Sequence, residues 1–90
     1  MLSESAWRVI ITPRAEKDLR RVHPGYLPRI RQALDALSIG PTQGDFRKLR
    51  GFDDEWRRRV GEWRIRFRPD FDRRTLVVTR ILPRGSAYRD

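Results

Sequence analysis

Apolar and charged residues alternate along residues 56–67, which read W-R-R-R-V-G-E-W-R-I-R-F. This alternation predicts a β-hairpin. Glycine at the first position of a two-residue loop favours a type II′ turn, because glycine adopts a positive φ without a Cβ clash. A loop of Gly61 and Glu62 sets the register of the two strands. It pairs Val60 with Trp63, Arg59 with Arg64, Arg58 with Ile65 and Arg57 with Arg66.

This register sorts the hairpin into two faces, since successive side chains of a strand point to opposite sides of the sheet. One face is apolar and is expected to be buried: it contains Trp56, Val60, Trp63, Ile65 and Phe67. The other is cationic: it contains Arg57, Arg59, Arg64 and Arg66. Only Arg58 breaks the pattern. The hairpin alone leaves two interpretations of the cationic face open, a solvated basic surface and a polyanion-binding surface.

The first half of the chain predicts one strand and two helices. Residues 6–12 are rich in β-branched residues and predict the strand. Thr12 and Pro13 are typical of a helix start, with a capping hydroxyl followed by proline. The buried side of this helix is expected to contain Ala15, Leu19 and Val22, and its solvent side Lys17, Asp18, Arg20 and Arg21. A second helix is predicted over residues 26–38, with a buried stripe of Leu27, Ile30, Leu34 and Leu37.

Gly40, as a left-handed cap, and Pro41 are expected to end the second helix. Residues 42–54 resemble a loop, with a short strand possible at 46–49. A turn follows the hairpin at residues 69–73, and the apolar run 76–82 predicts a strand inside the sheet. The order is β-α-α-β-β-β, an α+β fold in which an αα-hairpin covers one face of the sheet and leaves the other wet. Ninety residues allow one domain, spanning 1–90.

The net charge of +9 is concentrated in the second half of the chain. Residues 1–46 carry seven basic and five acidic side chains, whereas residues 47–90 carry fourteen and seven. Only Lys17 and Lys48 among the basic residues are lysines. Guanidinium groups bind phosphate bidentately and stack on bases, so nucleic acid is the first partner to consider. The alternatives are an acidic protein partner and a high-GC genome that encodes arginine in place of lysine, which explains the choice of cation but not the net charge.

Several kinds of chemistry are disfavoured by composition. The chain has no cysteine, no glycine-rich phosphate loop and a single histidine, His23, which we interpret as a loop residue. Asp53, Asp54 and Glu55 are the only acidic cluster and are interpreted as a solvated turn, not a metal site. No cofactor is therefore expected. The N-terminal segment lacks the features of a signal peptide, and no apolar run approaches the roughly 18–20 residues of a membrane span. A cytoplasmic protein without membrane contact is predicted.

Arginines and a tyrosine can still cleave RNA. When the 2′-hydroxyl attacks the adjacent phosphorus, negative charge develops on the phosphoryl oxygens, and preorganised guanidinium groups stabilise it. A tyrosine such as Tyr88 can stack on a base and hold the backbone in line for attack. Proton transfer is the weak point, because the pKa of arginine is so high that its guanidinium stays protonated at neutral pH.

The order of motifs resembles the RelE/ParE superfamily of bacterial toxins. The motifs are T-P-R-A-E-K-D-L, L-x-x-G-P, K-L-R-G, W-R-R-R-V-G-E-W-R-I-R-F and a terminal R-G-S-A-Y-R, and they cover nearly the whole chain. The resemblance implies two helices on a curved, mostly antiparallel sheet of about four strands. It also implies an antitoxin that wraps and neutralises the toxin, with a higher-order toxin–antitoxin oligomer possible.

Within that superfamily, RelE-like members are ribosome-dependent mRNA endonucleases, and ParE-like members inhibit DNA gyrase. The RelE-like interpretation assigns catalytic roles to Arg57, Arg64, Arg84 and Tyr88, and RNA-binding roles to Lys48, Arg50, Arg59 and Arg66. Arg57 and Arg64 would polarise the scissile phosphate, and Arg84 would assist the leaving group. Two departures weaken proton transfer: arginines replace lysines on the strand before the turn, and Pro83 stands where many relatives have histidine. A gyrase inhibitor without nuclease activity is the alternative, and a non-toxic module that only assembles with its antitoxin is a third hypothesis.

Overall fold

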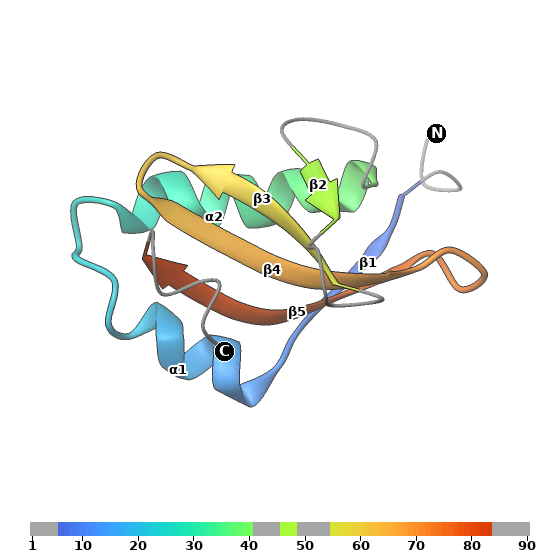
Figure 1. The fold of residues 1–90 in the computed structure, drawn as a ribbon, viewed down its shortest axis with the longest axis horizontal. Helices are drawn as coiled ribbons and strands as arrows, with labels where there is room; N and C mark the ends of the chain where they lie inside the picture. Colours follow the sequence, from blue (N-terminus) through green and yellow to red (C-terminus); the bar gives the residue numbers. More distant parts are fainter. Residues whose placement is uncertain (1–5, 41–45, 49–54, 84–90) are drawn as a thin grey trace.

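The computed structural model describes residues 6–40, 46–48 and 55–83, and contains two α-helices on one face of a five-stranded sheet (Figure 1). The helices are α1 (Pro13–Leu19) and α2 (Leu27–Ala36), and α2 continues into a short 3₁₀ turn, η2 (Leu37–Ile39). The strands are β1 (Arg8–Ile11), β2 (Phe46–Lys48), β3 (Trp56–Val60), β4 (Trp63–Asp70) and β5 (Thr75–Pro83). The predicted α+β class is confirmed. The short strand considered at 46–49 is present and adds a fifth strand.

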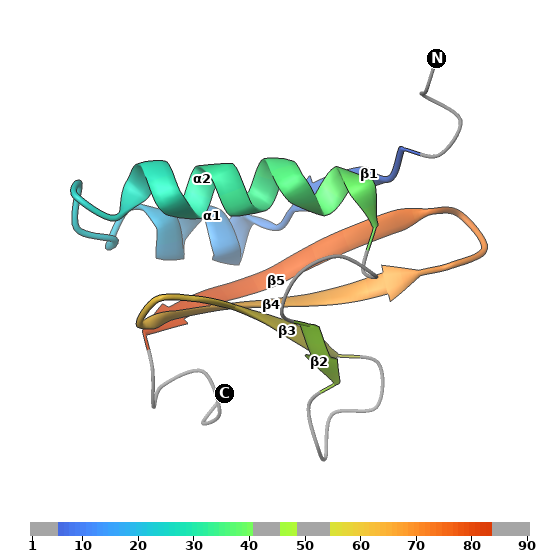
Figure 2. The same ribbon diagram turned by 90° about the horizontal axis from the view of Figure 1, so that it is seen from above.

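The sheet order is β1-β5-β4-β3-β2, and all neighbouring pairs except β1 with β5 are antiparallel. The apolar segment 76–82 lies inside the sheet, as predicted, because β5 is flanked by β1 and β4. Both helices lie on the same side of the sheet (Figure 2). None of the described helices is long and apolar enough to cross a membrane.

The hairpin register is the one that the sequence predicts. Val60 is opposite Trp63, and Arg57 is opposite Arg66. Gly61 has φ +59°, and Glu62 is not among the described residues with positive φ, as a type II′ turn requires. The alternating pattern and this turn therefore determine together which side chains meet the helices.

The core lies between the helices and the apolar face of the sheet. Ile65, Phe67 and Leu76 have no exposed surface, and Trp56, Val60 and Trp63 pack against the same cluster. The helices and the turns that follow them contribute the residues predicted from the periodicity, with Ala15, Leu19, Val22, Ile30, Leu34 and Leu37 buried and Leu27 half-buried. Burial of each large apolar side chain stabilises the fold by about 1.5–3 kcal/mol.

Both helices begin where their sequences indicate. The first is shorter than predicted: α1 ends at Leu19, and residues 20–22 form a turn. The Thr12 hydroxyl accepts a hydrogen bond from the Ala15 amide at 3.2 Å, which is the predicted cap of α1. After η2, Gly40 adopts φ +114° and ψ 166°. Its φ is positive but its ψ is extended, so Gly40 is not the left-handed cap predicted for it. Its lack of a Cβ instead allows the Trp7 indole to approach closely.

We expect Gly40→Ala to lower the free energy of unfolding more than Gly61→Ala does. At Gly61 an added Cβ would meet nothing nearer than the Arg29 guanidinium at 3.6 Å, so only backbone strain of about 1–2 kcal/mol is expected. At Gly40 the Cβ would lie 2.8 Å from Trp7 Nε1, and the ring must move as well. Urea unfolding measures the difference, with Glu62→Ala as the control in the same turn. Equal losses at the two glycines would contradict the role given to Trp7.

Candidate functional site: a cationic sheet face with buried acidic partners

The face of the sheet opposite the helices carries the predicted arginines. We call it the arginine face and define it by Arg57, Arg59, Arg64 and Arg66. Arg57 is opposite Arg66, and Arg59 is opposite Arg64. The first row continues onto β5, where Arg80 is opposite Arg66. Like charges directly opposite each other destabilise a sheet, so this row requires compensating negative charge.

The arginine face is not uniformly solvated, and the expectation of a wet face is wrong for its centre. Arg64 is 5% exposed and Arg66 is 4% exposed, whereas Arg57 is half-buried and Arg59 is exposed. Arg64 Nη1 donates to the carbonyl oxygens of Gly61 at 3.2 Å and Trp63 at 3.0 Å. These contacts hold its guanidinium against the hairpin turn.

Glu55 supplies negative charge to the arginine face. Its carboxylate is 5% exposed: Oε1 accepts from Arg66 Nε at 2.9 Å, and Oε2 accepts from Arg68 Nε at 3.1 Å. The Thr79 hydroxyl lies 3.2 Å from Oε2. The interpretation of Glu55 as part of a solvated turn is therefore wrong. Asp53 and Asp54, the other members of that cluster, lie outside the described residues.

The hairpin register contained a signal that could have identified Glu55. Trp56 is opposite Phe67, so extending the register by one residue places Glu55 opposite Arg68 and on the same face as Arg57. Thr79 was less accessible to prediction. It is the extra residue where the pairing of β4 with β5 shifts between Arg66 and Phe67, and such bulges are not visible in the apolar run of β5.

Asp18 is the second acidic residue whose position differs from the prediction. It was placed on the solvent side of α1 but is 6% exposed. Its Oδ2 accepts from Arg80 Nε at 2.8 Å and from the Ile81 amide at 2.9 Å. Strand β1 ends at Ile11, opposite Val78, and leaves the following edge of β5 uncovered. Asp18 satisfies a backbone donor on that edge, as buried polar groups require.

Arg58, which breaks the alternation of the hairpin, lies on the helix side of the sheet. Its Nη1 donates to the carbonyl oxygen of Ala33, on α2, at 3.2 Å. This contact connects β3 to the helix layer. The irregularity in the sequence pattern therefore has a structural explanation, a hydrogen bond between the sheet and α2.

The remaining predicted site residues are only partly placed. Arg50, Arg84 and Tyr88 lie outside the described residues, and Lys48 belongs to β2 but its side chain is outside the description. The last described residue, Pro83, is opposite Trp63 at the end of β5. The chain thus continues to Arg84 from the same end of the sheet at which Arg59 and Arg64 form a pair. The predicted roles of these residues stay predictions.

Arg66 is one of the predicted RNA-binding residues, but it is buried. Its side chain is 5% exposed and its Nε is engaged by Glu55. Its role in RNA binding stays a prediction, and its contacts favour a structural role beneath the more exposed Arg57 and Arg59.

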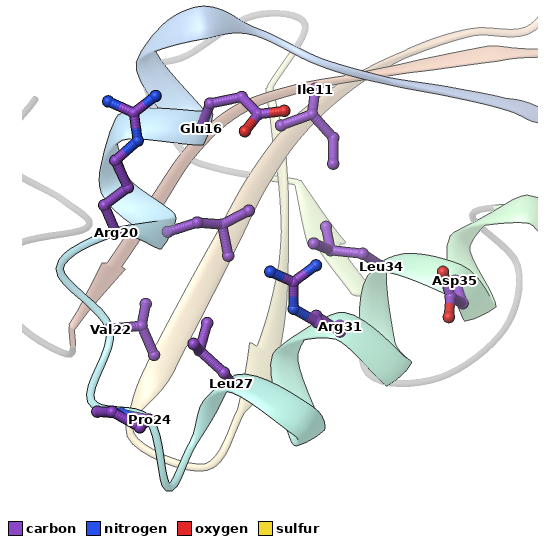
Figure 3. A pocket seen from close by; sticks show the side chains of 10 residues that line it. Ile11, Glu16, Arg20, Val22, Pro24, Leu27, Arg31, Leu34 and Asp35 are labelled. Carbon is purple, nitrogen blue, oxygen red and sulfur yellow. The ribbon is translucent and has the colours of Figure 1, made fainter.

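A groove separates the two helices on the other side of the molecule. It has a volume of about 640 Å³. Figure 3 shows that Leu27 and Leu34 approach it from α2 and Ile11 from β1. Charged residues of both signs line it as well: Glu16, Arg20, Arg31 and Asp35. It combines apolar and charged residues in the way expected of a site for an amphipathic segment.

Across residues 6–40, 46–48 and 55–83, no three histidine, aspartate or glutamate side chains gather into a group that could hold a metal ion. His23 is an exposed turn residue whose Nδ1 accepts a hydrogen bond from the Gly25 amide at 3.0 Å.

We expect Glu55→Gln to destabilise the fold strongly, because it removes the negative charge of a buried ion pair with Arg66. Breaking a buried ion pair by removing one partner costs about 3–5 kcal/mol. Chemical unfolding measures this loss. Arg68→Ala is the matched control: it removes the other arginine of Glu55, whose side chain is 62% exposed, and is expected to cost no more than about 1 kcal/mol. Similar losses for the two variants would show that Glu55 does not act through Arg66.

Known proteins share both the fold and the sequence pattern. The toxin RelE3 of Methanocaldococcus jannaschii is 29% identical over 86 residues, which covers 90% of this chain and 94% of that protein. The Mycobacterium tuberculosis toxin–antitoxin complex RelBE2 contains a chain with a TM-score of 0.78 and 26% identity, covering 88% of this chain and 99% of that one. A chain in the archaeal RelE–RelB complex of Pyrococcus horikoshii OT3 has a TM-score of 0.76 and 25% sequence identity. The match covers 89% of this chain and 97% of that one.

A family model matches almost the entire chain. The family is described as the ParE toxin of the type II toxin–antitoxin system parDE, and the match extends over residues 9–88. It includes all the strands and helices of the fold except the first residue of β1. The chain therefore belongs to the ParE toxin family, within the RelE/ParE superfamily of type II toxin–antitoxin systems.

Proposed function

We propose that this toxin arrests translation as a metal-independent endoribonuclease that cleaves mRNA on the ribosome. The observation that carries the proposal is the arginine face, which contains Arg57 and on which Arg59 and Arg64 form a pair at the end of the sheet from which the chain continues to Arg84 and Tyr88. The curated relative and the solved complexes bear the RelE name. Within the RelE/ParE superfamily that the sequence resembles, the RelE-like members are the ones that cleave mRNA.

The proposed reaction uses charge stabilisation more than proton transfer. The 2′-hydroxyl loses its proton to solvent water as its oxygen forms a bond to the adjacent phosphorus; the bond to the leaving 5′-oxygen breaks, and that oxygen takes up a proton from water. Arg57 and Arg64 bind the phosphoryl oxygens, whose negative charge increases in the transition state. Arg64 is preorganised, because its guanidinium is held against the carbonyl oxygens of the turn. Tyr88 stacks on a base, and Arg84 assists the leaving group.

We propose further that a cognate antitoxin neutralises the protein. The solved relatives are described as RelB–RelE complexes, which supports a partner of this kind. Two surfaces suit it. An acidic segment across the arginine face would relieve the repulsion between paired arginines and block RNA. The apolar residues of the groove between α1 and α2 suit an amphipathic helix.

Gyrase inhibition is the second candidate function. The observation that favours it is the family match itself, since the matching model describes the ParE toxin of parDE systems. The arginine face would then contact protein, not RNA, and nuclease activity would be absent. The two functions differ in what happens to mRNA during growth arrest.

Mapping RNA ends after induction distinguishes the two functions. We expect new 5′ ends inside translated codons within minutes of induction, and we expect them to disappear when translation is blocked beforehand. The culture carrying an uninduced gene is the control. Arrested growth with intact mRNA and an induced DNA-damage response would reject the nuclease and favour gyrase inhibition.

Single substitutions then test the assigned site. We expect Arg57→Ala to lower the mRNA cleavage rate by roughly 10²–10³-fold, the effect of removing one preorganised donor to a developing oxyanion. Tyr88→Ala is expected to lower it as well. The Arg57→Ala and Tyr88→Ala variants are better probes than Arg64→Ala. Removing the Arg64 side chain would also remove its hydrogen bonds to the carbonyl oxygens of Gly61 and Trp63.

Arg73→Ala is the matched control, because Arg73 is exposed at the turn between β4 and β5. Circular dichroism establishes that each variant is folded. Full cleavage by folded Arg57→Ala and Tyr88→Ala proteins would show that the site is assigned wrongly.

A further inference from the structure

Helix α1 has two sides that differ in charge. The side that lines the groove between the helices carries one residue of each sign, Glu16 and Arg20 (Figure 3). The opposite side carries only cations at its surface. Arg14 and Lys17 lie on α1, and Arg21 lies in the turn two residues beyond its end. All three are exposed.

The three cations surround a cavity at the edge of β5. Its volume is about 430 Å³, and its lining consists of Pro13, Arg14, Lys17, Asp18, Arg21 and Arg80. Asp18 is the only acid in this lining, and both of its oxygens are engaged by Arg80, with Oδ2 also accepting from the Ile81 amide. Asp18 is 6% exposed. The charge that the cavity presents to a ligand is therefore positive.

This arrangement is unfavourable for the free protein. Arg14 and Lys17 are three residues apart, and Lys17 and Arg21 are four apart, so neighbouring like charges repel along the helix. Arg14 also lies in the first turn, where the helix dipole disfavours a cation. A ligand that carries negative charge would relieve both effects.

The cavity is connected to the arginine face through one residue. Arg57, Arg66 and Arg80 form a row across β3, β4 and β5. Arg80 belongs to this row and also lines the cavity next to α1. The positive surface therefore continues from the arginine face, past the edge of β5, to α1.

We propose that Arg14, Lys17 and Arg21 bind phosphate groups of an RNA backbone and extend the arginine face around the edge of β5. The inference rests on the proposed function, in that it takes RNA as the polyanion. The lining favours RNA over a protein segment, because Pro13 is its one apolar residue and the cores of protein interfaces are depleted in charge. The groove between α1 and α2, with its apolar residues, lies on the other side of α1. Cations repeated every three to four residues, about 4–6 Å along the helix, suit successive phosphates of one strand.

The test compares two triple variants of equal charge. One is Arg14→Gln, Lys17→Gln and Arg21→Gln. The control is Arg8→Gln, Arg73→Gln and Arg74→Gln, which removes three exposed arginines where β1 begins and β4 turns into β5. Binding is measured over a series of salt concentrations with two probes, a short single-stranded RNA and an RNA duplex. Circular dichroism confirms that both variants are folded.

We expect the α1 variant to bind RNA roughly 10- to 100-fold more weakly than the control at about 0.1 M salt. The slope of log K against log salt should decrease in magnitude by about two, which corresponds to three lost phosphate contacts. Loss confined to the single strand would identify the cleaved strand as the source of the phosphates. Loss confined to the duplex would identify structured RNA, as in the ribosome.

Two results would overturn the inference. One is equal affinity and equal salt dependence of the two variants with both probes. The other is an α1 variant that binds RNA as the control does but no longer binds the antitoxin, which would make the α1 surface a protein-binding site. Binding does not require cleavage, so a wild-type protein that binds RNA through α1 but leaves mRNA intact would reject the proposed nuclease and retain this inference.

Discussion

The arginine face depends on one buried carboxylate. Arginines are directly opposite one another across β3, β4 and β5, and such pairs repel. Glu55 accepts hydrogen bonds from Arg66 and Arg68 and thereby places negative charge within the row. Asp18 does the same for Arg80 at the edge of the sheet. The two acids allow a dense cationic surface to exist on a folded sheet before any ligand is bound.

This arrangement separates two kinds of arginine. Arg66 and Arg80 are engaged by internal acids, whereas Arg57 and Arg59 are more exposed on the same sheet. Arg66 connects β4 to Glu55 and Arg80 connects β5 to α1, while Arg57 and Arg59 present more of their surface to solvent. A site built on rigid strands, with its side chains held by a supporting layer of contacts, maintains its geometry better than a site on loops.

The sequence predicts the architecture well because the fold follows periodicity. Alternation in residues 56–67 and the Gly61 turn suffice for the hairpin register, and the helical stripes suffice for the core. The errors at the site concern Asp18 and Glu55, which the local pattern assigns to solvent but which are buried. The partner of Asp18 is 62 residues away on β5, and no local pattern reports such a pairing. The candidate site is only partly predictable for the same reason: the arginines of the hairpin form a face, but which of them are buried depends on strands that are distant in the sequence.

The parallel pairing of β1 with β5 has a consequence for folding during protein synthesis. Strand β1 is hydrogen-bonded to no other strand in the described part of the sheet, and its partners are residues 75–78. During synthesis β1 has to wait until those residues have left the ribosomal tunnel, because a strand pair this far apart in sequence closes late. The order of strands therefore delays the pairing of β1 until late in synthesis. The complete sheet, with α1 fixed to its edge, forms only after nearly all of residues 1–83 have been translated.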